Sequence, residues 1–235
     1  MSTVINVDQQ EIAKFDALAA RWWDLEGDFK PLHEINPLRA NWIDQHSPVV
    51  GKKLLDVGCG GGILAEAMAQ RGASVTGIDM AEAALNVAEL HKLESGLEVD
   101  YHLSTAESLA ATSPEAYDIV CCLEMLEHVP NPDRVVAACA DLAKPGADVY
   151  FSTINRNPKS FLFAIVGAER ILRLLPAGTH EYEMLIRPSE LGGWLRAAGL
   201  QLERMTGLSY NPISKRYRLS EDDVSVNYMV HATKL

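Results

Sequence analysis

The sequence predicts an α/β fold in which helices cover both faces of a doubly wound, mainly parallel sheet of seven strands. Short apolar segments alternate with segments of helical spacing between residues 53 and 153, as in successive βαβ units. A loop made almost entirely of glycine, Gly58–Gly62, follows the first apolar segment directly. A carboxylate, Asp79, ends the second segment about 20 residues further on, at the spacing expected of a nucleotide-binding βαβ unit.

Each expected element follows from its local pattern. Apolar residues at helical spacing near the N-terminus predict helices over 9–25 and 31–46. In the alternating part, β segments are expected at 53–57, 74–79, 98–103, 117–123 and 148–153. The helices expected between them cover 62–70, 81–94 and 132–143. A last helix over 189–198 and two strands over 200–208 and 223–233 complete the seven strands.

We interpret residues 1–235 as one domain, because this length fits a single α/β unit with appendages. Its parts are an N-terminal helical lid (1–50), a cofactor-binding core (51–154), an insert (155–188) and a C-terminal helix with strands (189–235).

The insert is unusual because large apolar residues crowd its first half, at 161–166. The segment 158–176 is too short and too charged to span a bilayer. It can pack on the core, cover the site as a lid, or lie in the membrane interface with its aromatic end inserted. The sequence leaves these three interpretations open.

The composition narrows the classes of partner. The net charge of −11 repels a polyanion on average, and no basic block with interleaved aromatic residues occurs, so a nucleic-acid partner is disfavoured. The four cysteines form no C-x-x-C pair, and we interpret them as buried free thiols in a reducing cytosol. No leader pattern and no apolar run of about 18 residues occurs, which predicts a cytoplasmic chain without a membrane span.

The glycine loop and the acids beside it favour one class of nucleotide. A dinucleotide fingerprint binds pyrophosphate through a third glycine, and here Ile63 stands in its place. Asp56 precedes the loop, where it would repel a pyrophosphate. An adenosine compound with a cationic group and no phosphate satisfies both features, and S-adenosylmethionine is such a compound. NAD, FAD and a glycine turn that only packs helix on strand are the alternatives.

Ligands of open α/β sheets bind beyond the carboxyl ends of the strands, and this rule selects the contact residues. Asp79 is expected to accept hydrogen bonds from both ribose hydroxyls, with Met80 against the adenine face. Leu123 can contribute only its carbonyl or an apolar wall. The residues that we expect at the cofactor are Asp56, Gly58, Gly60, Asp79, Met80, Ala106, Glu107 and Leu123.

The segment Glu124–His128 carries the candidates for chemistry. If it is helical, Glu124, Glu127 and His128 share one face. A phenol with a pKa near ~10 is about one part in a thousand phenolate at pH 7, so its methylation requires removal of the proton. Either His128 acts as general base, or the three side chains hold a divalent ion such as Mg²⁺ that acidifies a bound hydroxyl. A capped helix start beside an ordinary histidine is the third interpretation.

Longer segments of the chain resemble the ubiquinone-biosynthesis O-methyltransferase family. Those in the first part are 12–15, 21–27, 29–33, 35–39, 55–66 and 124–130. Those in the second part are 151–156, 178–180, 188–191, 207–212 and 226–229. The likeness covers nearly the whole chain, and Arg-Trp-Trp-Asp at 21–24 and Tyr-Asn-Pro at 210–212 are its most specific segments.

The resemblance implies a class I S-adenosylmethionine-dependent methyltransferase fold of the Rossmann-like type. It implies two O-methylations, one of a 2-polyprenyl-6-hydroxyphenol and one of 3-demethylubiquinol. It also implies cofactor contacts for Arg39, Gly58, Asp79 and the residue at 123, where Leu123 replaces the methionine or serine of some members.

Further properties follow only from the resemblance. It implies a Mg²⁺ site at Glu124, Glu127 and His128, and peripheral attachment to the inner face of the membrane through 158–176. Two other functions stay open. One is an O-methyltransferase of another small phenol or carboxylate. The other is a cofactor-binding scaffold in a membrane-associated assembly such as a ubiquinone-biosynthesis complex.

Overall fold

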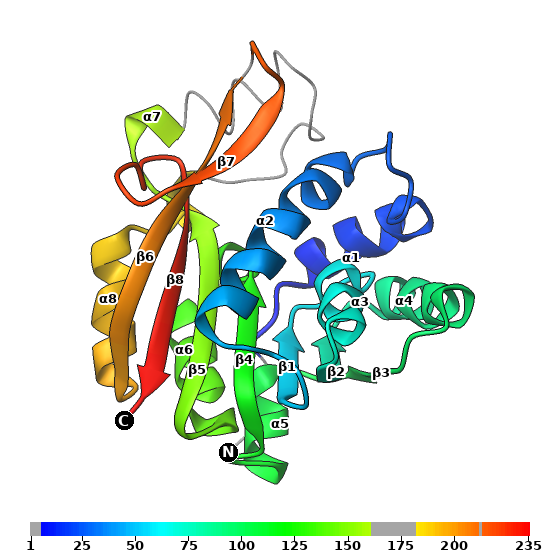
Figure 1. Cartoon of the computed structure of the whole chain (residues 1–235), viewed down its shortest axis with the longest axis horizontal. Helices are drawn as coiled ribbons and strands as arrows, with labels where there is room; N and C mark the ends of the chain where they lie inside the picture. The colour runs from blue at the N-terminus through cyan, green and yellow to red at the C-terminus, as the bar shows by residue number, and fades with distance from the viewer. Residues whose placement is uncertain (1–5, 161–181, 212) are drawn as a thin grey trace.

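An eight-stranded sheet runs through the computed structural model, which describes residues 6–160, 182–211 and 213–235 (Figure 1). Its strands are β1 (Lys53–Val57), β2 (Ser74–Asp79), β3 (Val99–Leu103), β4 (Tyr117–Leu123), β5 (Ala143–Ile154), β6 (Leu200–Asn211), β7 (Arg216–Ser220) and β8 (Asn227–Lys234). They lie in the order β3-β2-β1-β4-β5-β8-β6-β7. Strands β1 to β5 pair in parallel, and antiparallel pairs join β8, β6 and β7 to them. The predicted doubly wound, mainly parallel α/β fold is therefore confirmed.

The predicted count of seven strands is wrong by one. In the described part of the chain, β6 and β7 form an antiparallel hairpin before β8 begins. β7 pairs only with β6, where the Tyr217 ring lies 4.8 Å from the Tyr210 ring. None of its five residues is buried, and Arg216 and Arg218 interrupt its apolar residues, so it lacks the apolar run that marks the predicted strands. The strand expected from residue 223 begins at Asn227 instead.

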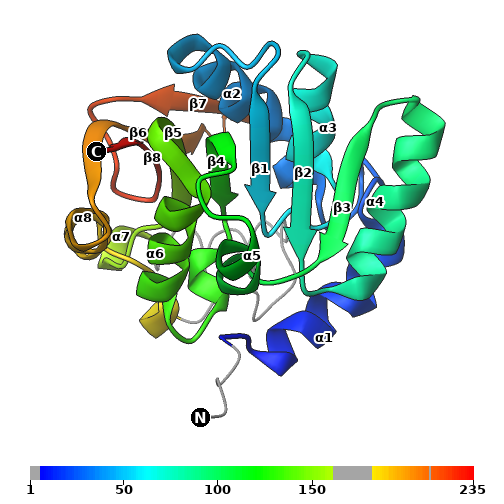
Figure 2. The same ribbon diagram turned by 90° about the horizontal axis from the view of Figure 1, so that it is seen from below.

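Helices cover both faces of the sheet (Figure 2). One face carries α2 (Lys30–His46), α3 (Ile63–Gln70) and α4 (Glu82–Ser95), and the other carries α5 (Ala106–Thr112), α6 (Pro132–Leu142) and α8 (Pro188–Ala197). Each layer encloses its own apolar core cluster. Central β4 is buried along five of its seven residues, as a parallel strand covered on both faces must be.

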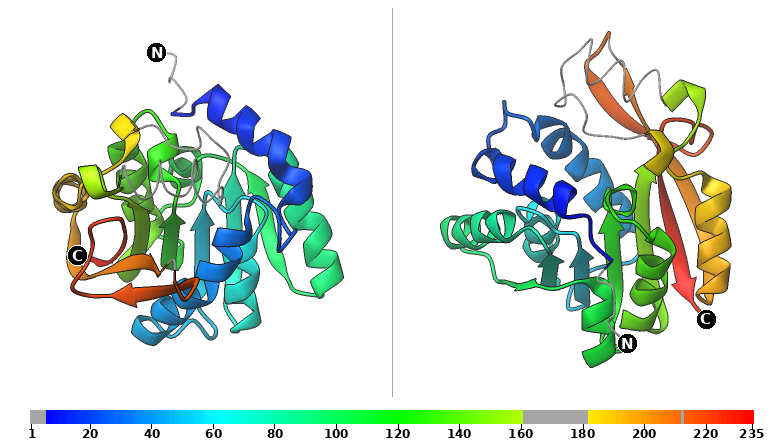
Figure 3. Two further views of the ribbon diagram at one scale, coloured as in Figure 1. Left: turned by 90° about the horizontal axis from the view of Figure 1, so that it is seen from above. Right: turned by 180° about the vertical axis from the view of Figure 1, so that it is seen from behind.

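Helix α1 (Gln9–Leu18) is shorter than the helix expected over 9–25, because a 3₁₀ turn, Ala19–Arg21, replaces its last part. It packs against α4 and lies above the carboxyl ends of the neighbouring strands (Figure 3). The chain order reverses between β1 and β4, which are adjacent. This reversal opens a crevice at their carboxyl ends.

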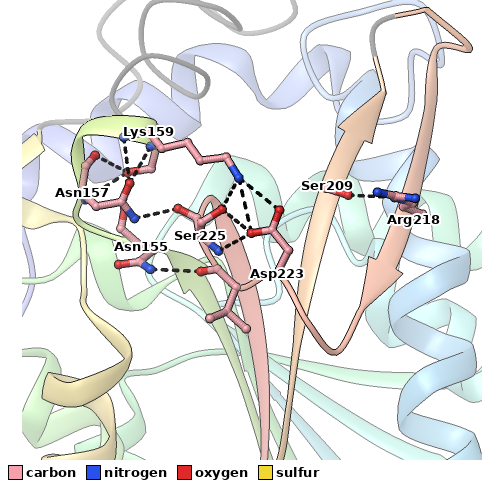
Figure 4. Close-up of polar contacts among 9 residues, drawn as sticks. Asn155, Asn157, Lys159, Ser209, Arg218, Asp223 and Ser225 are labelled. Atoms are coloured by element: carbon pink, nitrogen blue, oxygen red, sulfur yellow. Dashed lines mark hydrogen bonds and ion pairs between the residues drawn. The ribbon is translucent and has the colours of Figure 1, made fainter.

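The insert begins at a polar junction between β5 and the loop before β8 (Figure 4). The side-chain amide of Asn155 donates to the carbonyl of Val224 at 3.0 Å, and that of Asn157 donates to the carbonyl of Ser225 at 2.7 Å. Lys159 Nζ pairs with Asp223 Oδ2 at 3.1 Å. The apolar cluster at 161–166 and most of the segment 158–176 lie outside the described residues.

Candidate active site

A cavity of ≈ 180 Å³ lies at the carboxyl ends of β1, β2 and β4, beneath the N-terminal helices. It brings together every residue expected at the cofactor: Arg39, Asp56, Gly58, Gly60, Asp79, Met80, Ala106, Glu107 and Leu123. Of the residues expected to carry chemistry, Glu124 and His128 also line the cavity. Glu127 is buried behind them and is absent from the cavity wall.

The glycine loop lines the cavity and packs against the lid. Gly60 has φ +51°, and a Cβ added at Gly60 or Gly61 would overlap the Trp22 ring. The Trp22 ring stacks on Phe29 with ring centroids 4.0 Å apart, and Trp23 Nε1 donates to the carbonyl of Gly61 at 2.9 Å. Glycine is therefore required at Gly60 and Gly61 for a second reason besides ligand binding: a side chain there would displace the Trp22 ring.

Asp56 is a buried acid that is only partly satisfied by the protein. The residue is 3% exposed, and its Oδ2 accepts no hydrogen bond within the described residues, although a backbone hydrogen bond at Ala65 reaches the carboxylate. Burial, together with the negative charge of Asp79, raises the pKa of Asp56 to about 7. A buried carboxylate in this state favours a cation or a hydrogen-bond donor brought by a ligand.

Asp79 is oriented by the backbone around it. Its Oδ2 accepts from the amide of Gly60 and its Oδ1 from the amide of Ala81, both at 2.8 Å. Burial raises the pKa of Asp79, and these backbone hydrogen bonds oppose that rise. Each carboxylate oxygen has a second lone pair, so the group retains acceptor capacity for hydroxyl donors at the cavity.

An N-terminal segment crosses one edge of the cavity. Asn6 Nδ2 donates to Glu107 Oε1 at 2.8 Å and to the carbonyl of Asn131 at 2.9 Å. Asn6 Oδ1 accepts from the amide of Asn131 at 2.9 Å. Asn6 is 7% exposed, so this bridge is a buried link between the lid and the core beside Glu107, one of the residues expected at the cofactor.

Glu124 is held in a network of donors from three other elements. Its Oε1 accepts from Arg39 Nη2 at 2.5 Å and from Ser152 Oγ at 2.7 Å, and both its oxygens accept from Asn227 Nδ2 at 2.9 Å. Its backbone has φ +52°, an uncommon conformation for a residue with a Cβ. Arg39 Nε is buried and makes no hydrogen bond within the described residues, so a donor remains beside the cavity.

His128 meets the lid through its Nδ1. That atom lies 2.8 Å from Glu11 Oε2, and the Phe15 ring contacts the imidazole edge at a centroid distance of 5.2 Å. Burial lowers the pKa of His128, but the hydrogen bond to Glu11 and the charges of Glu127, Glu11 and Glu124 raise it, and the net shift is upward. The imidazole is thus a more basic group than an ordinary histidine.

The segment Glu124–His128 is not an α-helix, so the condition under which its three polar side chains would share one helical face is not met. Only a single 3₁₀ turn, Leu126–His128, forms here, and Glu124 precedes it in a left-handed conformation. Glu124 is directed to Arg39, Glu127 accepts from Thr153 Oγ1 at 2.9 Å, and His128 is directed to Glu11. No three His, Cys, Asp or Glu side chains converge into a metal-ion site in the described ranges. These residues do not fit the implied Mg²⁺ ligand set.

The local sequence pattern does not identify several residues of the site. Glu11 and Asn6 meet partners more than a hundred positions away, His128 and Asn131. Neither has a motif around it that specifies this pairing. Asn227 falls within the segment 226–229, whose resemblance to the family is the one indication of its importance.

Comparison with known proteins decides the family. A profile described as a methyltransferase domain matches residues 33–204. The ubiquinone biosynthesis O-methyltransferase of Saccharophagus degradans is 66% identical over 231 residues, which cover 98% of this chain and 98% of that protein. This chain belongs to the ubiquinone biosynthesis O-methyltransferase family. The family's protein from Stutzerimonas stutzeri is also 66% identical, over 229 residues that cover 97% of this chain and 98% of that one.

Solved structures agree with the fold. Magnesium protoporphyrin IX methyltransferase of Synechocystis PCC 6803 with bound SAH superposes with a TM-score of 0.70 at 18% identity, covering 97% of this chain and 100% of that one. The [4+2]-cyclase SpnF superposes equally well, with a TM-score of 0.70 at 18% identity, covering 98% and 97%. Because a cyclase shares the fold, the fold does not decide the chemistry, and membership of the O-methyltransferase family does.

Proposed function

We propose that this O-methyltransferase transfers the methyl group of S-adenosylmethionine to hydroxyls of polyprenylated catechol-type intermediates and of demethylubiquinol. The observation that carries the proposal is the cavity of a family member that holds Asp56, Asp79, a glycine loop and His128 together. The family name supplies the pathway of the substrate, and the cavity supplies groups that suit the co-substrate.

The co-substrate is assigned to the β1–β2 side of the cavity. Asp56 would pair with its cationic amino group, because the carboxylate is buried and its Oδ2 has no partner among the described residues. Asp79 would accept the ribose hydroxyls, and Arg39 Nε would donate to the co-substrate carboxylate. Met80, Ala106 and Leu123 supply apolar walls that also line the cavity.

The chemical step needs a proton acceptor beside the methyl group. His128 would take the proton of the acceptor hydroxyl as its oxygen attacks the methyl carbon. The carbon–sulfur bond breaks with its electron pair on sulfur, a carbon–oxygen bond forms, and S-adenosylhomocysteine and the methyl ether leave. Holding both reactants in line supplies much of the rate. Glu124 would act by holding Arg39, and Glu127 by supporting the turn, since neither is placed as a proton acceptor.

We also propose that the chain works at the inner face of the membrane, because a polyprenyl tail partitions into the bilayer. The membrane contact predicted for 158–176 falls largely on residues that the structure does not describe. No helix in the described ranges has the length and hydrophobicity needed to cross a membrane. The proposed attachment is peripheral, and other enzymes of ubiquinone biosynthesis are its proposed neighbours.

The test is methyl transfer from labelled S-adenosylmethionine to a catechol with a prenyl tail and to the same catechol without it. We expect kcat/KM to favour the prenylated acceptor at least about tenfold, because each buried methylene contributes about 0.8 kcal/mol. In the same assay, His128→Ala should lower turnover about 10²–10⁴-fold. Its calorimetric affinity for S-adenosylhomocysteine should stay within about twofold, because the assigned co-substrate contacts are intact.

Each outcome bears on a separate part of the proposal. Absence of methyl transfer to both catechols would refute the assigned reaction. Equal kcat/KM for the two acceptors would refute the polyprenylated substrate class. Turnover of His128→Ala at the wild-type rate would remove His128 as the base.

A further inference from the structure

We propose that Glu11, carried by the lid helix α1, is the positioning residue that orients His128 for methyl transfer. This inference rests on the proposed role of His128 as the base. It assigns a function to the N-terminal lid beyond covering the cavity, because the base would reach its full strength only when α1 is docked.

The contact itself has the geometry of an orienting pair. Glu11 Oε2 lies 2.8 Å from His128 Nδ1, and the two side chains are 18% and 12% exposed. The residues are 117 positions apart, so the contact exists only in the folded lid. Both residues line the cavity, which places the pair at the site of the proposed reaction.

The neighbouring ring holds the imidazole in one orientation. Phe15, one helical turn after Glu11, meets the His128 ring at a centroid distance of 5.2 Å and an interplanar angle of 88°. An edge-to-face contact of this kind restricts rotation of the imidazole. Glu11 and Phe15 thus act from one face of α1, since residues four apart in a helix are neighbours.

A carboxylate on Nδ1 defines which ring nitrogen reacts. Glu11 can only accept when ionised, so the Nδ1 atom carries the proton that it shares with Glu11. The lone pair of the neutral ring is then on Nε2, the atom through which His128 would take the proton of the acceptor hydroxyl. The same carboxylate stabilises the imidazolium that forms during the step.

The charges around the pair maintain this state. The hydrogen bond to His128 lowers the pKa of Glu11 to about 2. Burial opposes this shift and Lys14 adds to it, and Glu11 stays anionic at working pH. Glu127 and Glu124 are the other acids whose charges face His128. Within the described residues, Thr153 donates to Glu127, and Arg39, Ser152 and Asn227 donate to Glu124.

Docking of α1 has other supports, so removal of the carboxylate does not by itself detach the helix. Asp16 Oδ1, further along α1, accepts from the amide of Ala83 at 3.0 Å. Asp8 caps α1 by accepting from the amide of Gln10 at 2.8 Å. Asp16 is absent from the cavity wall, so Asp16→Asn is a matched control that removes a negative charge from α1 without touching His128.

The experiment compares Glu11→Gln, Glu11→Asp and Asp16→Asn in the full chain. We expect Glu11→Gln to lower kcat about 10–100-fold, with acceptor KM and calorimetric affinity for S-adenosylhomocysteine within about twofold. The acidic limb of the kcat–pH profile should move to lower pH, because the imidazole loses the charge that raises its pKa. Glu11→Asp should restore part of kcat, and Asp16→Asn should leave the acidic limb in place.

A second variant separates this inference from the proposed function. In a His128→Ala background, Glu11→Gln should have no further effect on kcat, because Glu11 acts through His128. An equal loss of kcat in Glu11→Gln and Asp16→Asn, or an unmoved acidic limb, would overturn the inference while leaving His128 as the base. Wild-type turnover of His128→Ala would instead refute the proposed base and this inference with it.

Discussion

At the scale of single residues, two acids of the cavity, Glu124 and Asp56, differ in what satisfies them. Glu124 receives donors from Arg39, Ser152 and Asn227 and is complete without a ligand. Asp56 is buried beside Asp79, and its pKa is raised to about 7. A protonated Asp56 must lose its proton before it can pair with a cation, so ligand affinity becomes linked to pH.

We expect affinity for S-adenosylmethionine to rise up to about tenfold per pH unit from pH 5 to 7 and then to level off. The sign follows from the raised pKa, since the neutral acid that predominates below about 7 cannot bind the amino group as an ion pair. Asp56→Asn should weaken binding about 10–100-fold at pH 8 and remove most of this pH dependence. Calorimetry from pH 5 to 8 checks both, and an unchanged slope in Asp56→Asn would show that another group titrates.

At the scale of elements, the glycine loop packs against the N-terminal lid and also lines the proposed ligand site. The Trp22 ring covers Gly60 and Gly61, and Trp23 donates to the carbonyl of Gly61. The loop therefore joins two elements that are remote in sequence. An alanine methyl group introduced at Gly60 or Gly61 would therefore disturb the packing of the lid.

Gly60→Ala is expected to destabilise the fold more than a matched change at Gly51. Both glycines have positive φ, +51° and +71°, so an alanine at either costs about 1–2 kcal/mol of backbone strain. At Gly51 the added methyl meets nothing within 4 Å, whereas at Gly60 it displaces the Trp22 ring, which adds about 1–3 kcal/mol. Urea unfolding followed by tryptophan fluorescence measures the difference, and equal losses for both variants would mean that Trp22 moves aside freely.

At the scale of the whole molecule, buried polar links fasten the N-terminal lid to distant parts of the core. Asn6 bonds to Glu107 and Asn131, and Glu11 pairs with His128. These links tie α1 to the ends of β3 and β4 across the cavity. Stability of the whole chain should therefore respond to the ionisation of the Glu11–His128 pair.

We expect Glu11→Gln to reduce the free energy of unfolding by about 1–2 kcal/mol between pH 4.5 and 6.5, after allowance for solvent screening. The pKa of Glu11 is lowered from 4.5 to about 2, so its stabilisation is present above 4.5 and is lost as pH falls towards 2. The pKa of His128 is raised above 6.5, so its stabilisation is complete below 6.5 and is lost as pH rises through the raised value. Urea titrations at about pH 3, 5.5 and 9 should give the largest difference from wild type at the middle pH. A pH-independent difference would assign the loss to packing.

Local patterns were sufficient for the core of the fold and for the walls of the cavity. The period of apolar residues separates strands from helices, and the carboxyl-end rule then places Asp56, Asp79 and Glu107 at one crevice. The eight residues expected from these patterns line the cavity, as does Arg39, which only the family resemblance indicates. These features are predictable because each depends on neighbours in the chain or on a general rule of parallel sheets.

The tertiary structure alone decided how the acids and the histidine are paired. Glu124 lies 85 positions from Arg39, and Glu11 lies 117 positions from His128, so no local pattern records either contact. The sequence leaves open whether Glu124–His128 is helical, and the folded chain forms a single 3₁₀ turn there, with Glu124 bonded to donors from α2, β5 and β8. The partner of a buried charge is set by which elements pack against it, and that is a property of the folded chain.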